Sequence, residues 1–449
     1  MDKIKSRYDY IVVGSGAGGG TLVRELARKG DKEILCIEWG EPPPRVGEML
    51  DCRYYYDFKR LPDFLPKGLR KIPLMPPKTR EGSIMWRAIT AGGTSVISLG
   101  NGARCMEREL REMGIDLRDE FAETEREVGL QPLGRRLLSK GSRRIREAAG
   151  QLGYEFQPMP KYLDQSRCTR CHKCLYGCKY HAKWDTRAWL REAEEQGADL
   201  LYETRVEQVK ISNGRARGVV ARGPKGIMEI EADSVILAAG GMATPVILQA
   251  SGIKEAGGGF FLDLFRNTYG TTEEPNLNQV KEPNMAMVDL EWFSADGFLL
   301  SPFMNHGRMT RLQEMSPLQA MRSAKRMIGI MTKITDEPNG RVLADGSCSK
   351  PLTRRDRKRF DQGASIAREI LLKAGARAGS LFESKIQGAH PGGTAAIGSV
   401  VDSDLQTRVD NLFVCDASVL PAREFNERSR LPPIITLVAL AKRLAKTLN

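Results

Sequence analysis

Tyr8 to Glu38 reads Y-D-Y-I-V-V-G-S-G-A-G-G-G-T-L-V-R-E-L-A-R-K-G-D-K-E-I-L-C-I-E, and this stretch decides the fold. Tyr10 to Val13 is a short apolar run rich in β-branched residues, which predicts a buried parallel strand. Apolar residues then recur at helical spacing, and a second apolar run, Ile34 to Ile37, predicts another strand. Three glycines with G-x-G-x-x-G spacing separate the first strand from the helix: Gly14, Gly16 and Gly19.

This order of elements is typical of a dinucleotide-binding site. One glycine allows a tight turn, one lets the backbone approach a pyrophosphate, and one packs the helix on the strand. The helix N-terminus faces the phosphates, and an acid at the tip of the second strand accepts a hydrogen bond from a ribose hydroxyl. Glu38 occupies that position. The pattern predicts a cofactor site, but it does not separate FAD from NAD.

Length and charge set the broad class of the protein. The chain has 449 residues, nine cysteines and a formal net charge of +13. This length suits two or three domains, or one large two-layered enzyme. No apolar run reaches about 18 residues, so no membrane-spanning helix is expected, and an N-terminus without an apolar signal core predicts a cytoplasmic protein. The charge fits either a soluble basic surface or an acidic partner such as a small electron carrier, an anionic membrane surface or an anionic substrate, whereas its scatter argues against nucleic acid.

The rest of the chain alternates between two kinds of segment. Asp199 to Val220 predicts strands, and the chain then returns through a meander into a buried strand, Ser234 to Ala239. Gly257 to Ser384 predicts an antiparallel sheet with helices, the last over Arg354 to Lys373, and is expected to hold the substrate. An amphipathic terminal helix is expected over Ile434 to Leu448.

Four motifs, in this order, resemble the glucose-methanol-choline (GMC) oxidoreductases. They are G-S-G-A-G-G from Gly14, G-G-T-S…N-G from Gly92 to Gly102, A-A-G-G-M-A-T-P-V-I-L-Q-A-S-G-I from Ala238 to Ile253, and H-P-G-G-T…I-G…V-D-N-L-F-V-C-D-A-S-V-L-P from His390 to Pro421. The match runs over most of the chain, and the last two motifs are the most specific. The substrate region resembles the family only loosely.

The resemblance implies an α/β fold. A Rossmann-type FAD-binding domain, with a parallel sheet and a β-meander, is expected to be interleaved with an α+β substrate domain built on an antiparallel sheet. The expected limits are 1–105, 193–255 and 386–449 for the FAD-binding domain, 106–160 and 256–385 for the substrate domain, and 161–192 for a separate cysteine segment.

The resemblance also implies the residues that hold the cofactor. Glu38 is expected on the adenosine ribose, Val206 near the adenine, and Asp416 near the ribityl-pyrophosphate. The full expected set is Gly14, Gly16, Ala17, Gly18, Gly19, Glu38, Gly93, Thr94, Asn101, Val206, Ala239, Asp416 and Ala417.

In the family, the residue at the position of His390 faces the flavin and the substrate carbinol. A neutral imidazole with a pKa near neutrality can remove the hydroxyl proton while hydride leaves for flavin N5. The family's second catalytic residue, His or Asn, directly precedes the proline that opens the terminal helix, but Pro432 stands there in this chain. Asn426, Glu427 or Arg430, from an extra segment just before it, could supply the lost hydrogen bond, or none does. We take Asn426 as the second catalytic candidate.

A cysteine run, R-C-T-R-C-H-K-C-L-Y-G-C-K, is the remaining motif. Its C-x2-C-x2-C-x3-C spacing is the one with which bacterial ferredoxins wrap an iron–sulfur cluster. A zinc site, which usually uses two separated C-x-x-C pairs, and unligated cysteines are the alternatives. The expected ligands are Cys168, Cys171, Cys174 and Cys178.

The fourth ligand stays open. Cys178 completes a [4Fe–4S] cluster, a remote cysteine such as Cys52 or Cys105 does so, or three ligands hold a [3Fe–4S] cluster. The flanking His172 and His181 are expected on the surface rather than on a metal.

Together these features predict an FAD-dependent dehydrogenase that oxidises a CH–OH group of an alcohol, polyol, sugar or lipid-like alcohol. Electrons would leave one at a time through the cluster to an acidic, ferredoxin-like carrier or a partner redox subunit. The reverse reaction, a ferredoxin-fed reductase, is one alternative. The other is a flavin and cluster redox subunit without catalysis. Peripheral contact with a membrane is left open.

Overall fold

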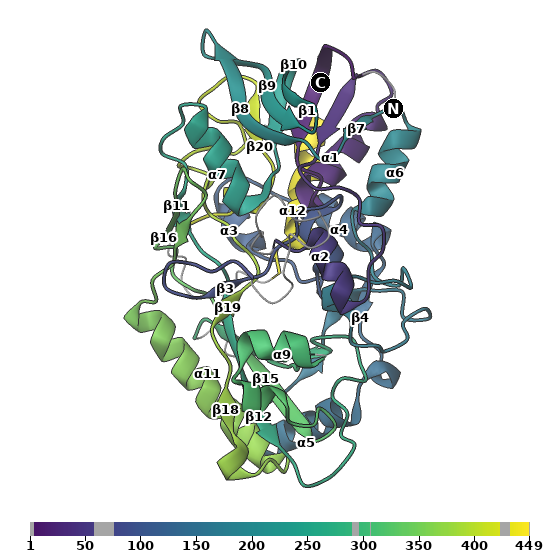
Figure 1. Cartoon of the computed structure of the whole chain (residues 1–449), viewed down its shortest axis with the longest axis vertical. Coiled ribbons are helices and arrows are strands. Elements are labelled where there is room, and N and C mark those ends of the chain that lie inside the picture. The colour runs from purple at the N-terminus through teal and green to yellow at the C-terminus, as the bar shows by residue number, and fades with distance from the viewer. Residues whose placement is uncertain (1–3, 58–75, 290–295, 306, 423–431, 449) are drawn as a thin grey trace.

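Two halves of the protein meet across a central cavity. The computed structural model describes residues 4–57, 76–289, 296–305, 307–422 and 432–448. The half at the top of Figure 1 contains the first sheet and the described residues at both ends of the chain, and the lower half contains the second sheet. The chain passes between the two halves several times, so both are built from segments that are distant in the sequence.

The first sheet is the parallel sheet that the opening motif predicts, extended by a meander. In spatial order its strands are β7 (Asp199–Leu201), β2 (Ile34–Ile37), β1 (Arg7–Val13), β10 (Gly226–Leu237), β9 (Arg215–Gly223) and β8 (Arg205–Ser212), and β20 (Leu412–Val414) also pairs with β10. The early part of β10 runs antiparallel to β9, whereas its later part runs parallel to β1 and β20. One continuous strand therefore replaces the two that the sequence suggested.

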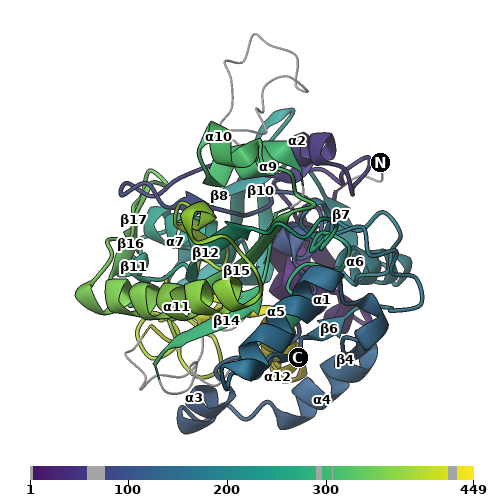
Figure 2. The same cartoon turned by 90° about the horizontal axis from the view of Figure 1, so that it is seen from below.

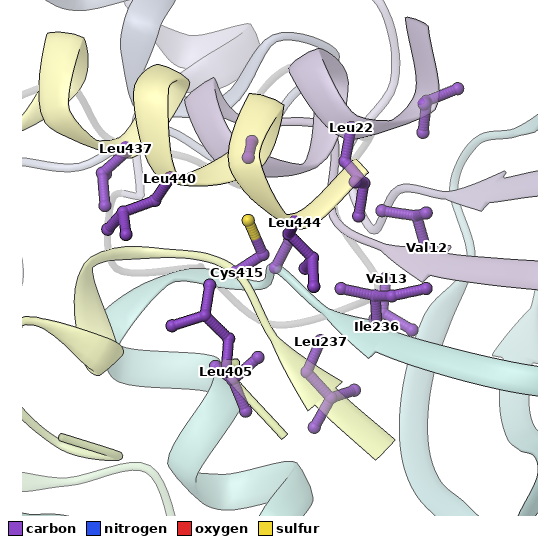
Figure 3. Close-up of a cluster of buried hydrophobic side chains, with 14 of the residues drawn as sticks. Val12, Val13, Leu22, Ile236, Leu237, Leu405, Cys415, Leu437, Leu440 and Leu444 are labelled. Atoms are coloured by element: carbon purple, nitrogen blue, oxygen red, sulfur yellow. The ribbon is translucent and has the colours of Figure 1, made fainter. Parts of the chain in front are cut away.

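Helices pack around the first sheet. Helix α1 (Ala17–Ala27) packs on β1 and β2 and contacts α6 (Arg187–Glu195) and α12 (Ile434–Thr447), and α7 (Gly240–Ala250) packs on β8. Helix α4 (Arg118–Glu127) packs on α12, and the short helix α3 (Glu107–Glu112) precedes α4 in the chain. Because its residues are apolar on almost every side, α12 is buried along most of its length and packs against α1. Figure 3 shows Leu440 and Leu444 of α12 gathered with side chains of β1 and β10 in one apolar cluster.

The second sheet is antiparallel apart from one edge pair. Its strands are, in order, β14 (Phe298–Pro302), β15 (Met327–Ile334), β12 (Leu264–Thr271), β19 (Gln387–Gly388) and β3 (Ile84–Met85), with β18 (Phe382–Glu383) also paired to β12. Helix α11 (Arg354–Lys373) lies across this sheet with α5 (Lys140–Gln151) beside it, as Figure 2 shows. A capping box fixes the start of α11, because Thr353 and Asp356 exchange side-chain to backbone hydrogen bonds.

The remaining elements are short. They are β11 (Gly258–Phe260), β16 (Gly340–Val342) and β17 (Cys348–Ser349) in one sheet, the pairs β5 (Gln157–Pro158) with β13 (Met287–Val288) and β4 (Leu130–Pro132) with β6 (Pro160–Tyr162), the short helices α2 (Cys52–Tyr55), α9 (Arg308–Glu314) and α10 (Pro317–Ala320), and the 3-10 turns η1 (Met49–Asp51), η3 (Gly93–Ile97), η4 (Arg135–Leu137), η5 (Cys174–Tyr176), η6 (Ala378–Ser380) and η7 (Ala417–Val419).

The predicted fold class is confirmed, because an α/β sheet and an antiparallel sheet with helices are both present. The segment 106–160, which was predicted to belong to the substrate domain, contacts both halves: α4 packs on α12, and α5 packs on α11. Among the described residues, no helix has both the length and the apolar character needed to cross a membrane.

Candidate active site and cysteine site

A cavity of about 670 Å³ lies where the two halves meet. Residues at the carboxyl ends of β1, β2, β10 and β20 line it on one side. Residues of the second sheet, including Phe265, Met331 and Gln387, line it on the other side. Ligands of doubly wound folds bind at this end of the parallel strands.

The glycine motif closes one wall of the cavity through backbone contacts. Gly14 has φ +100°, and a Cβ there would come within 2.3 Å of the Ala238 carbonyl oxygen. A Cβ on Gly18 would lie 2.0 Å from the carbonyl oxygen of Cys415. At Gly16, by contrast, a Cβ would meet no protein atom within 4 Å, so the backbone there is open to a ligand.

Two buried carboxylates fix the strand ends around this wall. Glu38 accepts hydrogen bonds from the Ser15 amide (3.0 Å), the Ser15 hydroxyl (2.7 Å) and the Gly40 amide (2.8 Å). Asp416 accepts from the Gly240 amide at the start of α7 (2.8 Å) and from the Thr244 hydroxyl (2.5 Å). Burial raises the pKa of both carboxyl groups, and these hydrogen bonds oppose that shift.

The structure brings the predicted cofactor residues together. All of them except Gly19 line the cavity. Gly19 lies just behind it, where a Cβ would approach the Gly14 carbonyl oxygen to 2.0 Å. Its role is therefore the packing of helix on strand.

The wall of the cavity opposite the glycine motif contains many apolar side chains. Its side chains come from the second sheet and its flanks: Trp86, Phe265, Met285, Phe303 and Met331. Pro432 also lines the cavity and brings no polar side chain to the position where the family places its second catalytic residue. Asn426, the candidate for that role, lies outside the described residues, as do Glu427 and Arg430.

His390 lines the same cavity and makes its contacts through one ring nitrogen. Its Nδ1 lies 2.9 Å from Oδ2 of Asp263 and 3.1 Å from Nζ of Lys333. Lys333 Nζ and Asp263 Oδ2 are themselves 3.1 Å apart. The His390 side chain is 21% exposed, whereas Asp263 and Lys333 are almost fully buried beneath it.

Three neighbouring strands assemble this cluster. Asp263 immediately precedes β12, His390 follows β19, and Lys333 lies near the end of β15. Because β12 pairs with both β15 and β19, the three side chains meet at one end of the second sheet. Asp263 has a left-handed backbone (φ +54°), and the buried Asp336 carboxylate holds that bend by accepting from the amides of Leu262 and Leu264.

Sequence reasoning identified His390 and missed its two partners. Both partners interrupt apolar runs, Asp263 in F-F-L-D-L-F and Lys333 in M-I-G-I-M-T-K-I. A charge within a strand that is otherwise buried was the available signal. Asp263 and Lys333 are 127 and 57 residues from His390 in the sequence, so their convergence depends on long-range strand pairing, which local patterns do not encode.

The four cysteines of the run line one small cavity beside η5. All four are free, and backbone amides of Arg170 and Asn284 donate to Cys168 and Cys174. Arg170 and His172 have positive φ angles, so the loop curls around the sulfur atoms. Among the described residues, no three His, Cys, Asp or Glu side chains form a ready site for a single metal ion.

Two buried lysines lie beside the cysteines. Lys161 acts electrostatically on Cys168 and Cys174, and Lys183 acts on Cys174 and Cys178. Within the described part of the chain neither ammonium has a carboxylate at ion-pair distance, although Glu282 and Asp185 act on them from further away.

Backbone and amide oxygens accept the hydrogen bonds of these lysines. Lys161 donates to the Leu99 carbonyl (2.9 Å) and to Asn101 Oδ1 (2.5 Å), and both of those residues line the large cavity. Lys183 donates to the carbonyl oxygen of Ser95 (2.9 Å), which also lines the large cavity. The hydrogen bonds of the two lysines therefore run from the neighbourhood of the cysteines to residues that line the large cavity.

The two histidines of the cysteine segment lie in different environments. His172 was expected on the surface, but it is buried, because its ring lies between the carbonyl oxygens of Glu282 (2.8 Å) and Met304 (2.5 Å). His181 is exposed, as expected. Cys178 lines the cysteine cavity, whereas the remote candidates Cys52 and Cys105 do not.

Comparison with known proteins adds independent findings. Over its whole length the chain is similar to an uncharacterized protein of Methanocaldococcus jannaschii, at 29% identity over 98% of this chain and 99% of that protein. It is 23% identical to a long-chain-alcohol oxidase of Arabidopsis thaliana, over 100% of this chain and 69% of that protein. The crystal structure of pyridoxine 4-oxidase from Mesorbium loti has a similar fold, with a TM-score of 0.74, 17% identity and 98% of each chain covered.

The family models agree with the motifs and with the cavity that they line. The model of the N-terminal part of the GMC oxidoreductases matches residues 8–264, and that of their C-terminal part matches residues 350–427. The N-terminal match alone covers more than half of the chain and includes the glycine motif, Glu38 and the cysteine run. The chain therefore belongs to the GMC oxidoreductase family.

Proposed function

We propose that this protein is an FAD-dependent dehydrogenase that oxidises the CH–OH group of an apolar alcohol and passes the electrons out through an iron–sulfur cluster. The observation that carries this proposal is the junction between the two cavities. Cys174 lines the cysteine cavity, and the next residue, Leu175, lines the large cavity. One peptide unit thus separates the two candidate cofactor sites.

The large cavity fits FAD. The open backbone at Gly16 provides room for a pyrophosphate, and the buried Glu38 stands at the tip of β2, where a ribose hydroxyl is expected. The cavity then continues past Asp416 and Ala417 to His390, so one elongated cofactor can extend from the glycine motif to the base. Bound FAD supplies the acceptor for the carbinol hydrogen and its electron pair.

His390 is suited to act as the base for that reaction. Its Nδ1 faces Asp263, so Nε2 is the ring nitrogen left for a substrate. Desolvation by burial, followed by the nearby Lys333 ammonium, lowers the pKa of the imidazole, and the neutral, proton-accepting form is favoured. As the C–H bond breaks, the O–H bond of the alcohol gives its proton to Nε2, and the carbinol becomes a carbonyl.

The cysteine site fits an iron–sulfur cluster. Two of its four thiols, those of Cys168 and Cys174, accept backbone hydrogen bonds, and burial raises the pKa of Cys168 to about 11, so cluster binding releases thiol protons. A buried ammonium without a carboxylate partner is costly, and a negatively charged cluster of thiolates would balance both Lys161 and Lys183. A cluster at this place supplies one-electron transfer to an external carrier.

The apolar lining indicates the substrate class. Aromatic and methionine side chains form the wall opposite the glycine motif, which favours a lipid-like alcohol over a sugar or a polyol. Similarity to a long-chain-alcohol oxidase agrees with this choice. That relative is an oxidase, and the proposed cluster is the feature that favours dehydrogenation in this chain. The net charge of +13 suits an acidic, ferredoxin-like acceptor.

Anaerobic purification tests the cofactors. We expect FAD to be released on denaturation, and iron and acid-labile sulfide to be present with a broad visible absorption. Changing Cys171 to serine should remove the iron and the sulfide and leave the FAD in place. Changing Cys348, a free cysteine that does not line the cysteine cavity, is the matched control. One zinc per chain without iron or sulfide would disprove the cluster, and a flavin-free protein that binds NADH would disprove FAD.

A substrate panel tests the reaction. Long-chain primary alcohols, polyols and sugars are mixed with the protein without oxygen, and the visible absorption of the flavin is followed. We expect long-chain alcohols to bleach the flavin and to yield the carbonyl product. If no alcohol reduces the flavin while reduced ferredoxin does, the protein works as a reductase or as a redox subunit.

A further inference from the structure

Pro432 stands where the resemblance places the second catalytic residue of the family, so the polar partners of His390 come from elsewhere in the chain. Pro432 cannot exchange protons or hydrogen bonds through its side chain, yet His390 is not without polar partners. Asp263 and Lys333 form a buried ion pair at 3.1 Å on the side of Nδ1, at the end of the second sheet. Asp263 lies at the end of the stretch that the N-terminal family model matches, 8–264, and Lys333 lies between the two matched stretches.

We propose that Asp263 and Lys333 act together as the positioning pair for His390, one fixing its tautomer and the other keeping it neutral. The inference rests on the proposed function only in that His390 is the base. Neither residue is expected to touch the reacting atoms, because both lie on the Nδ1 side of the ring.

The donor and acceptor pattern gives the pair its two roles. An ammonium can only donate and a carboxylate can only accept, so in the tautomer that carries its proton on Nδ1, Asp263 Oδ2 receives hydrogen bonds from both Nδ1–H of His390 and Lys333 Nζ. The proton is thereby held on Nδ1, and the lone pair is held on Nε2. The contact of 3.1 Å between Nζ and Nδ1 brings two donors together, and this repulsion grows when the ring becomes cationic.

The two partners act on the imidazole in opposite directions. Lys333 lowers the pKa of His390, whereas the hydrogen bond and the charge of Asp263 raise it. No other charged group in the described chain is found to act on this ring. Cys105 lies near the pair, but burial raises the pKa of its thiol to about 12, so it stays neutral.

The backbone conformation at Asp263 allows a substitution that changes the charge alone. Its φ of +54° is a conformation that asparagine adopts readily, so Asp263→Asn removes the charge without a new backbone strain. Lys333→Met keeps the length of the buried side chain and removes its charge. Lys333→Arg retains a cation and serves as the conservative variant.

The experiment is a titration of the histidines by nuclear magnetic resonance on the FAD-loaded protein. The chain has four histidines, and His390→Gln assigns the signal of His390 among them. We expect the pKa of His390 to rise by about one unit or more in Lys333→Met, because Asp263 then acts alone, and to fall below the parent value in Asp263→Asn. Lys333→Arg should restore the parent value.

Opposite shifts in the two variants support the positioning pair. Shifts in the same direction, or none, overturn it. If Asp263→Asn does not fold, Lys333→Met decides alone, since a rise supports the inference and its absence contradicts it. The measurement needs no substrate, so it holds even if no alcohol proves active. With an active alcohol, the acid limb of flavin reduction should move to higher pH in Lys333→Met, because the neutral base forms only above its pKa.

Discussion

At the scale of single residues, the buried charges mark the chemistry of this protein. Lys333 shares its site with a carboxylate, and its charge acts on the imidazole of His390. Lys161 has only oxygen atoms of neutral groups within hydrogen-bond distance in the described chain, and it acts on Cys168 and Cys174. Lys333 therefore favours the neutral form of the His390 imidazole over its cationic form. Lys161 favours negative charge on the nearby cysteine sulfur atoms.

Lys161→Met should make the proposed cluster harder to reduce. The reduced cluster carries one more negative charge than the oxidised form, and the buried ammonium stabilises that charge. We expect the midpoint potential of the cluster to become more negative, as measured by a redox titration followed by electron paramagnetic resonance. The control is Lys446→Met, which removes a half-exposed lysine that pairs with Glu120. An unchanged potential with a full iron content would show that Lys161 is only structural.

His390→Ala should slow reduction of the flavin by an active alcohol about 10²–10⁴-fold, the usual effect of losing a positioned base. FAD and iron contents should stay at the parent level, because the glycine motif, Glu38 and the four cysteines lie outside the segment that carries His390. His181→Ala, at an exposed histidine, is the matched control. Reduction of the flavin at the parent rate in His390→Ala would mean that this histidine is structural.

At the scale of elements, the regular units could be predicted and their pairing could not. The glycine motif, β1, α1 and β2 are confirmed because adjacent residues encode strand, turn and helix. The helix predicted over Arg354 to Lys373 has those limits. The second sheet was expected only as a class, since β19 and β12 pair across more than one hundred residues. Asp263 and Lys333 were missed for the same reason.

Helix α12 supports the first half, and its contribution can be measured. Leu440 is 1% exposed and packs in the cluster of Figure 3. Leu440→Ala should lower the free energy of unfolding by about 2–5 kcal/mol, because the removed methyl groups leave a cavity. Leu372→Ala on α11, where the side chain is 43% exposed, should change it by about 0.5 kcal/mol or less. Equal losses in the two variants, measured by denaturant unfolding, would contradict the assigned packing.

At the scale of the whole molecule, the proposed function sends electrons from the large cavity to the cysteine cavity. The large cavity takes its walls from both halves, and the cysteine cavity lies behind Leu175. Lys173, Lys179 and Tyr180 line the cysteine cavity, and Lys179 and Tyr180 are exposed. Both lysines pair with Glu48 (2.5 and 3.0 Å), so these three side chains together carry one net positive charge. A rim of this charge favours a carrier with an acidic surface, and its association should weaken as salt is added.

Cys168→Ser separates the two steps that this arrangement implies. Oxidation of the alcohol needs the large cavity and His390, so the variant should still bleach its flavin without oxygen at close to the parent rate. Transfer to an acidic one-electron carrier needs the cysteine site, so steady-state reduction of that carrier should be lost. Cys348→Ser should retain both steps, because its sulfur does not line the cysteine cavity. If Cys168→Ser still reduces the carrier at the parent rate after iron and sulfide are gone, electrons leave directly from the large cavity, and the cysteine site has a structural role.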